Sequence, residues 1–293
     1  MTVISTRKNF TAYLFLAPSY LPLIAFLVLP MFAAVLLSFT EWDLLTPPQW
    51  IGLDNFIELF KDKKFYSSLG NTLYFVAGYL PIVYILGLAA ALALNSKFRG
   101  SGWIRAAYFL PVITSWVIVA LLWKWILNPQ GGLINSGLAV FGIEGPGWWT
   151  STAWAMPSII LASAWKDLGY VMLILLAGLQ AIPPEYKEAA AIDGASNWHI
   201  LRKITIPLLT PSTFFVIVVS LINNFQVFDQ IWLMTEGGPE GSTTVILYNI
   251  VANSFDYGRM GYASAMSLAL FAIILAITLI QLRLQKRWVH YED

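Results

Sequence analysis

The sequence predicts an all-α integral membrane protein with six transmembrane helices, and three observations support that prediction. Of 293 residues, 58% are hydrophobic and 11% are charged, whereas about 25% of a soluble domain is charged. Mean hydropathy is +0.68, and the apolar residues form runs long enough to cross a bilayer. The basic residues gather in alternate connecting segments. The net charge of +1 gives no reason to expect nucleic-acid binding.

Six apolar segments are long enough to cross a membrane, which takes about 20 residues. The first is too long for a signal-peptide core and lacks a small-residue cleavage site, so we expect it to be retained. The chain has no cysteine, which excludes disulfides and thiol chemistry. The expected spans are Tyr13–Leu37, Asn71–Leu94, Ala106–Leu127, Pro157–Gln180, Ser212–Met234 and Tyr262–Leu284.

The distribution of basic residues orients these spans. With the N-terminus inside, eleven lysines and arginines fall in cytoplasmic segments and four in outer segments. We therefore expect a multi-pass protein of the inner (cytoplasmic) cell membrane with both termini in the cytoplasm. The eleven are Arg7, Lys8, Lys97, Arg99, Arg105, Lys187, Arg202, Lys203, Arg283, Lys286 and Arg287; the four are Lys61, Lys63, Lys64 and Arg259.

The first outer segment, from Thr40 to Gly70, carries its own helical pattern. Phe56, Leu59 and Phe60 recur at helical spacing, which predicts a short amphipathic helix on the outer surface.

A polar, alanine-rich stretch interrupts the apolar sequence between the fourth and fifth predicted spans. Pro183-Pro184 can open a helix, because the first turn has no internal partners for its N–H groups. Glu185 and Glu188 then lie near the positive end of that helix. Gly194 follows where the helix would stop, since glycine tolerates the left-handed conformation. The pattern predicts the first helix of a cytoplasmic helix–turn–helix.

A second short helix is expected in the same loop. Ser196 or Asn197 can cap it, and it would run from Trp198 to Lys203. Pro207 and Pro211 are expected to end it before the fifth span. The structural alternative is an ordinary cytoplasmic loop with an amphipathic helix.

This loop resembles a known family motif. Glu188-Ala189-Ala190, followed at fixed spacings by Gly194, Ile204 and Ile206-Pro207, resembles the EAA loop of ABC importer permeases. Ile206 stands where the family usually has leucine. The flanking residues resemble the carbohydrate-uptake branch, of the maltose- and glycerol-3-phosphate-type first permease subunit. Further likenesses occur at Gly52-Leu53-Asp54-Asn55-Phe56, Asn71-Thr72, Phe109-Leu110-Pro111, Gly132 with Asn135, and Gly237-Gly238-Pro239.

The resemblance implies one transmembrane permease domain over residues 1–293, with a core at about 70–285 and a coupling loop at about 183–207. It implies that the loop docks into a separate ATPase subunit. The implied partners are a second permease subunit, two ATPase subunits, an extracytoplasmic solute-binding protein and membrane lipid, with ATP and Mg on the ATPase subunits. The chain has no G-x-x-x-x-G-K-[ST] motif, so we expect no bound cofactor, no metal and no catalysis here. The implied coupling residues are Glu188, Ala189, Ala190, Asp193 and Gly194.

Four charged residues lie within the predicted spans: Lys124, Lys166, Asp167 and Asp229. Charges in a bilayer are costly and mark functional sites by default. Lys166 and Asp167 are adjacent and cannot face each other, so each needs a partner elsewhere. Asp229 can pair with Lys124 or Lys166. Structural ion pairs, substrate contacts and snorkelling to the interface all remain open as roles.

Neutral amides make a stronger case for solute contact. Asn223, Asn224 and Gln226 can both donate to and accept from hydroxyl groups, although hydrogen bonding between helices is the alternative. The resemblance places substrate contacts on the spans on either side of the coupling loop, at Asn224 after it and at Leu168, Gly169 and Met172 before it. We expect Asn224 midway along the fifth span, opposite Gly169.

The sequence therefore predicts the permease subunit of an ATP-driven importer for a sugar, oligosaccharide or sugar-like polyol. A phosphorylated polyol is the nearest variant, but no cluster of intramembrane arginines supports it. An ion-coupled carrier would leave the polar loop without a role, and the sequence shows no paired broken helices. A membrane-embedded enzyme is disfavoured, because His199 and His290 are the only histidines and no metal-ligand spacing occurs.

Overall fold

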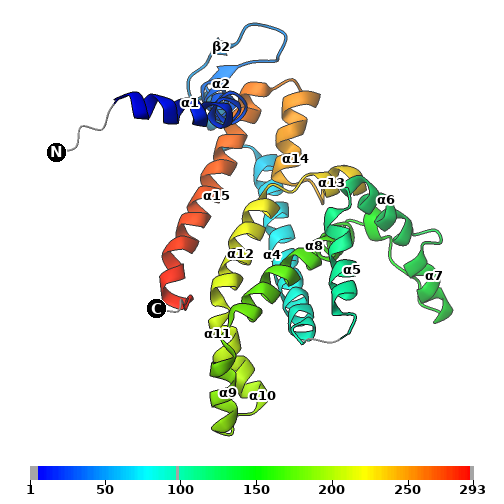
Figure 1. The fold of residues 1–293 in the computed structure, drawn as a ribbon. Coiled ribbons are helices and arrows are strands. Elements are labelled where there is room, and N and C mark those ends of the chain that lie inside the picture. The colour runs from blue at the N-terminus through cyan, green and yellow to red at the C-terminus, as the bar shows by residue number, and fades with distance from the viewer. Residues whose placement is uncertain (1–5, 97–98, 291–293) are drawn as a thin grey trace. The chain divides into compact units, whose positions relative to one another are not determined.

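The computed structural model describes residues 6–96 and 99–290, with side chains described from Phe15 onward. Lys97 lies outside the described residues, as do the side chains of Arg7 and Lys8. The described chain is mostly helical (Figure 1), which confirms the all-α prediction. It divides into two compact units, residues 1–62 with 250–272, and residues 63–249 with 273–293.

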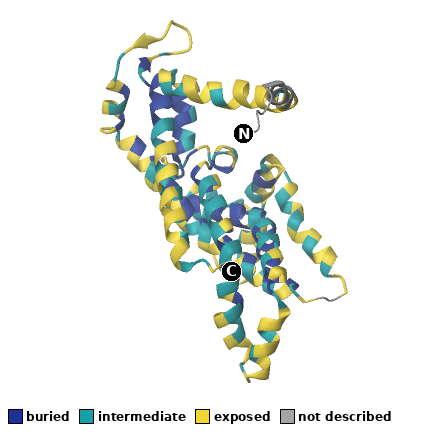
Figure 2. Cartoon of the chain, turned by 60° about the vertical axis from the view of Figure 1, so that its left-hand side comes forward, coloured by how far each residue is buried: buried dark blue, intermediate teal, exposed yellow. Residues whose placement is uncertain are grey.

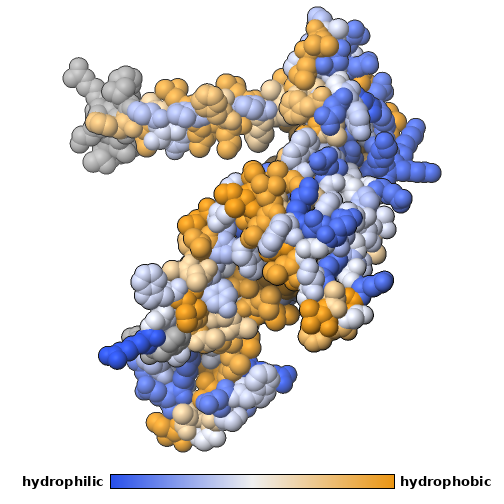
Figure 3. All heavy atoms as spheres, turned by 90° about the vertical axis from the view of Figure 1, so that its right-hand side faces the viewer, coloured by the Kyte–Doolittle hydropathy of each residue, from blue (hydrophilic) through white to orange (hydrophobic). Residues whose placement is uncertain are grey.

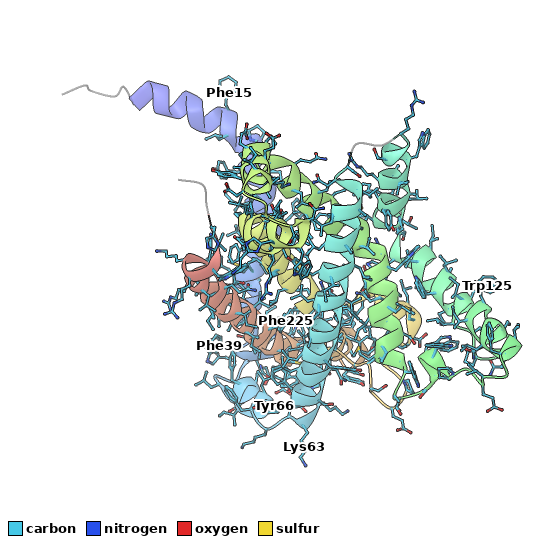
Figure 4. The ribbon with its side chains drawn as sticks, turned by 90° about the horizontal axis from the view of Figure 1, so that it is seen from below. Phe15, Phe39, Lys63, Tyr66, Trp125 and Phe225 are labelled. Carbon is cyan, nitrogen blue, oxygen red and sulfur yellow. The ribbon has the colours of Figure 1, made fainter. Side chains whose placement is uncertain are left out.

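The first unit combines the N-terminal apolar helix with a small subdomain of two strands and a short helix. In the apolar segment Phe15–Leu37, none of the residues in its most hydrophobic stretch is buried. Mostly hydrophobic side chains therefore cover the helix that leads from the grey N-terminal residues in Figure 3. Phe15 projects away from that helix in Figure 4. The unit contains α1 Thr6–Leu23, η1 Ile24–Val28, α2 Leu29–Leu37, β1 Thr40–Glu41, β2 Gln49–Trp50, α3 Asp54–Leu59, η4 Ala252–Asp256 and the start of α15 Met260–Trp288.

The subdomain of β1, β2 and α3 is held together by polar contacts, one buried and one exposed. Strands β1 and β2 pair antiparallel, and α3 confirms the predicted short helix. The buried Asn55 amide donates to the carbonyl oxygens of Ser38 and Thr40, each at 2.9 Å. Arg259 Nη2 donates to both carboxylate oxygens of Glu58 at 2.6 Å. These bonds explain why the Gly52–Phe56 stretch forms a defined structure.

The second unit is a helical bundle around α4 and α8. Helices α5 and α12 pack on α8, α12 also packs on α4, and α13 packs on α6 and α8. Phe225 is one of its fully buried side chains, and Figure 4 shows it among the helices. The unit contains α4 Lys63–Leu94, α5 Ser101–Ile113, α6 Trp116–Ile126, α7 Leu133–Val140, η2 Trp148–Thr150, α8 Ala155–Ala181, α9 Pro184–Ile192, α10 Asn197–Ile200, η3 Leu201–Thr205, α11 Ile206–Leu208, α12 Thr210–Phe225, α13 Asp229–Met234, most of α14 Ile246–Val251 and the end of α15.

Two motifs that lie far apart in the sequence meet in this unit. Asn71 donates from its side-chain amide to the carbonyl oxygens of Gly241 and Thr244, each at 3.0 Å. The backbone N–H of Ile246 donates to the hydroxyl of Thr72 at 2.9 Å. Asn71-Thr72 therefore anchors the loop that follows Gly237-Gly238-Pro239.

Four helices are long and apolar enough to cross a membrane, or up to six if each of two bent pairs counts as one span. The four are Phe15–Leu37, Lys63–Leu94, Ala155–Ala181 and Met260–Trp288. Each contains most of a predicted span. The other two predicted spans need correction, because neither is one straight helix.

The third predicted span, Ala106–Leu127, is broken between α5 and α6 with a bend of 100°. Thr114 leaves the helix in an extended conformation, and the Ser115 hydroxyl accepts from the Val117 N–H to cap the next helix. Pro111 lacks a helical donor just before the break. A proline followed by capping residues thus ends one helix and starts another.

The fifth predicted span, Ser212–Met234, is also wrong in its bounds. Helix α12 ends at Phe225, and α13 starts afresh at Asp229. The bent pair that could form this span runs from Asn197 to Phe225, with a bend of 59°. Asn224 lies at the end of α12 and donates to its own helix, at the Ser220 carbonyl oxygen (2.6 Å). Such a bond competes with the backbone ladder.

Close contact between α5 and α8 depends on Gly169. A Cβ atom at this position would overlap the carbonyl oxygen of Tyr108, so Gly169→Ala should force the helices apart. Overpacking costs about 1–3 kcal/mol, and the melting temperature should fall by several degrees. The matched control is Gly137→Ala on α7, where an added Cβ meets nothing within 4 Å. Thermal unfolding in detergent measures both; equal melting of Gly169→Ala and wild type would contradict the packing.

Candidate functional site

A polar cavity of about 470 Å³ lies in the second unit where several helices begin or end. Its size falls within the range of small-molecule sites. It is bordered by the start of α6, the middle of α8, the end of α12 and the start of α13. Its lining is rich in amides and carboxylates: Trp116, Asp167, Asn223, Asn224, Gln226, Val227, Phe228, Asp229, Gln230 and Leu247.

Three helices join through hydrogen bonds at the base of this cavity. The hydroxyl of Tyr79 on α4 donates to Asp167 Oδ2 on α8 at 2.8 Å, and Tyr79 also interacts with the side chain of Asn224 on α12. Tyr79 and Asn224 are buried. Asn223 and Gln226 are exposed and remain accessible to a solute. The cavity therefore has a fixed polar base and free amides at its rim.

Lys166 satisfies the broken end of α5. Its ammonium donates to the carbonyl oxygens of Val112 at 2.9 Å and Pro111 at 3.3 Å. The ammonium also lies over the Trp116 ring, 5.3 Å from the ring centroid. A cation is favoured at a helix C-terminus, where orphaned carbonyls concentrate negative charge. Lys166 thus caps a helix inside the bundle.

The predicted pairing of Asp229 with Lys124 or Lys166 is wrong. Lys124 lies 5.1 Å from the Trp149 ring centroid, and Lys166 bonds to backbone carbonyls. Among the described residues, the one ion pair joins Arg259 to Glu58. The four charges therefore do not neutralise one another across helices: the lysines contact rings and carbonyls, and the aspartates line the cavity.

The structure separates the predicted solute residues into two groups. Asn223, Asn224 and Gln226 line the cavity together with Asp167 and Asp229. Gly169 is packed against α5, Met172 is fully buried, and Leu168 is half-buried, and none of the three is on the cavity lining. The expected place of Gly169, opposite Asn224 on the solute path, is taken by a helix–helix contact.

Sequence reasoning missed Tyr79, Trp116 and Gln230. A tyrosine and a tryptophan in apolar segments look like packing residues, and Gln230 was hidden in a span assumed to be continuous. The signal that could have found Trp116 is Thr114-Ser115, a capping pair just after Pro111.

The predicted coupling loop has the expected first helix and turn. Pro184 stands in the first turn of α9 with Glu185, and the N–H of Ala195 bonds to the carbonyl oxygen of Ala190 at 2.9 Å. Gly194 has φ of +79°, in the left-handed region expected of a helix-terminating glycine. Ser196 caps α10, because its hydroxyl accepts from the His199 N–H.

The second helix of the loop is longer than predicted. Helical structure continues from Asn197 through a π turn, Leu201–Thr205, to Leu208. Pro207 lies in the first turn of α11 rather than beyond the end of the helix, a position that proline tolerates. The chain bends only at Leu209, before α12. The loop and the fifth span are thus joined by one bent helical rod.

The loop exposes apolar side chains that nothing in the described chain covers. Ile192 is 86% exposed, Trp198 68% and Tyr186 48%, and Figure 2 shows α9 and α10 largely in the colour of exposed residues. Glu188 is also exposed. Together with Lys187, it lines a cavity of about 750 Å³ between the loop and Arg105. These three apolar side chains and Glu188 make the loop a candidate interaction surface.

Comparison with known proteins decides the family. Residues 83–290 match the model of the binding-protein-dependent transport system inner membrane component. The chain belongs to this family. It is therefore a transport permease, and the coupling loop and the polar cavity both lie within the matched region.

Similar proteins cover nearly the whole chain. A probable ABC transporter permease, YesP of Bacillus subtilis, is 40% identical over 99% of this chain and 95% of its own length. The trehalose/maltose transport system permease MalF of Thermococcus litoralis is 33% identical over 94% of each. The solved structure of a bacterial ABC transporter that imports the acidic polysaccharide alginate contains a chain with a TM-score of 0.85, 27% identity and 96% coverage of both chains.

The position of Asn224 predicts that its substitution affects transport more than assembly. Asn224→Leu removes a polar group from the cavity base, and a lost hydrogen bond is worth about 0.5–1.5 kcal/mol, so transport per assembled complex should fall about 2- to 12-fold. The control is Asn249→Leu, because Asn249 is also buried and hydrogen-bonded, to Ser68, but does not line the cavity. Asn249→Leu should lower only the yield of complex.

Complex yield and solute uptake are measured on the same preparation. If Asn224→Leu lowers the yield while uptake per complex stays normal, Asn224 joins helices and does not contact the solute.

Proposed function

We propose that this chain is the permease subunit of an ATP-driven importer for a neutral sugar, oligosaccharide or sugar-like polyol. ATP would be hydrolysed with Mg on separate ATPase subunits. A second permease subunit and an extracytoplasmic solute-binding protein would complete the assembly. The proposal assigns two tasks to the chain, coupling at the polar loop and solute passage at the cavity.

The exposed coupling loop is the observation that supports this function best. Helix α9 presents Glu188, Ala189 and Ala190 on a rigid element that ends at a left-handed Gly194, with Asp193 just before it. Small side chains allow close approach of a partner backbone, and Ile192 offers an apolar anchor. Because α10, η3, α11 and α12 continue as one bent rod, a movement of the loop would reach α12 and its cavity as a rigid-body shift.

The cavity lining favours a neutral hydroxylated solute. Amides can donate to and accept from hydroxyls, and the carboxylates of Asp167 and Asp229 are strong acceptors. The described lining has no basic residue, so this chain supplies no counter-charge for a phosphorylated polyol. Several relatives have names that refer to sugars, among them the trehalose/maltose permease.

The broken helices make an ion-coupled carrier the alternative function to consider. Such carriers commonly contain paired discontinuous helices, and two bent pairs are present here. The exposed apolar loop would have no role in a carrier that works without an ATPase, however. Family membership likewise favours the importer.

We infer that the coupling loop lies in the cytoplasm and the loop around Glu240 outside, as the distribution of basic residues indicates. Both termini would then be cytoplasmic, in the inner membrane. This orientation and the docking of the ATPase can be tested together.

The chain lacks cysteine, so one introduced thiol reports on one place. Ile192→Cys should react with a membrane-impermeant reagent in inside-out vesicles stripped of peripheral subunits, because Ile192 is 86% exposed. Adding the purified ATPase subunit back should lower that reaction rate at least severalfold. Labelling is quantified by mass spectrometry.

The matched control is Glu240→Cys on an exposed outer loop. It should react in right-side-out vesicles and be insensitive to the ATPase subunit. Reaction of Ile192→Cys from outside would overturn the orientation, and undiminished reaction with the ATPase subunit bound would overturn docking at α9.

A further inference from the structure

The α5–α6 break and the cavity share a single aromatic side chain. Trp116 is the first residue of α6, and it lines the cavity beside Asp167 and the amides. Its position depends on how the break is held, because Ser115 and Thr114 just before it are outside any helix. A tryptophan face is a large apolar surface suited to the C–H face of a sugar ring.

Lys166 contacts both sides of that break. It is 6% exposed and hydrogen-bonds to the last carbonyls of α5, while its ammonium lies over the Trp116 ring. On α8 it stands next to Asp167, which lines the cavity, and three residues before Gly169, which contacts the backbone of α5. One side chain therefore links α5, α6 and α8 at the cavity wall.

We propose that Lys166 is a positioning residue that holds Trp116 on the wall of the cavity. The ammonium is attracted by the negative face of the indole ring and is fixed in place by two carbonyl oxygens at the negative end of α5. Lys166 has no contact with the cavity interior, so it acts on a solute through Trp116. That this cavity passes the solute rests on the proposed function; the link between Lys166 and Trp116 does not.

A thiol at the cavity rim can report on Trp116 without a known solute. Gln226→Cys introduces one into the cysteine-free chain at an exposed lining position. Its rate of reaction with a small water-soluble maleimide depends on how far Trp116 closes the wall. The rate is measured in the complete complex, purified in lipid nanodiscs.

Loss of the lysine should open the wall. In the Gln226→Cys background, Lys166→Met should raise the reaction rate about 2- to 30-fold, the range spanned by exposed and desolvated cation–π contacts. Trp116→Leu should raise it to a similar extent. Lys166→Arg keeps the charge and should restore the slow rate. Lys166→Gln can still donate to a carbonyl but has no charge for the ring, so it should also react fast.

The combination Lys166→Met with Trp116→Leu separates positioning from general loosening. If Lys166 acts through Trp116, the double variant should react no faster than Trp116→Leu alone, because the two substitutions remove one interaction. The proposal would be overturned if the two rate increases multiplied in the double variant. It would also be overturned if Lys166→Gln left the reaction rate unchanged. Where Lys166→Met does not assemble, the Gln and Arg variants decide.

A thiol outside the cavity serves as a control for general loosening of the protein. Glu240→Cys should keep its rate in every Lys166 background, and a parallel rise there would show that the lysine only stabilises the bundle. Failure of the wild-type complex to move any sugar would count against the proposed function, whereas an additive double variant would count against Lys166 alone.

Discussion

Backbone groups that leave a helix inside an apolar bundle need new hydrogen-bond partners, since water is not there to provide them. The break between α5 and α6 meets this constraint with side chains from both sides. The Thr114 hydroxyl donates to the Leu110 carbonyl oxygen at 2.9 Å, and Ser115 caps α6. Lys166 donates to the carbonyl oxygens of Pro111 and Val112, which follow Leu110. A buried lysine is costly without partners, and here the broken helix provides them.

The polar cavity exists because two interruptions meet. Helix α6 begins with Trp116 on one side, while α12 ends at Phe225 and α13 begins at Asp229 on the other. Each interruption brings capping and linking residues that are more polar than the helices around them. Asn223, Gln226 and Asp229 therefore project into a space that straight helices would have filled. We propose that the polar cavity formed at these breaks is where a polar solute would pass.

The coupling loop and the cavity are connected by structure rather than by proximity. From Asn197 the helical rod runs through a π turn and a 59° bend to Phe225, so Asn224 is carried at the far end of the element that begins beside Gly194. The close packing of Gly169 on α5 and the hydrogen bond from Tyr79 to Asp167 join this region to α4 and α8. Rigid elements in contact can transmit a displacement that flexible loops would absorb.

Local patterns were readable from the sequence, and long-range ones were not. Gly194 and Pro184 act through their own backbone, so the end and start of α9 could be predicted. Composition identified the apolar segments, and Asn223, Asn224 and Gln226 were recognised because amides are rare there. Hydropathy does not show where a helix bends, however, so the α5–α6 pair was predicted as one span without its 100° bend. The roles of Lys166, Trp116 and Gly169 depend on which helices pack together. The sequence of one segment does not show its neighbours in the fold.

The most direct test is a cryo-electron microscopy map of the assembled complex in lipid, with its ATPase subunits trapped by a non-hydrolysable ATP analogue and its binding protein loaded with sugar. The account predicts sugar density in the cavity of this chain, against Asn223, Gln226 and Asp167, with Trp116 stacked on the ring and the α5–α6 break closed by Lys166. Sugar density that avoids this cavity, or a continuous α5–α6 helix in the assembled transporter, would contradict it.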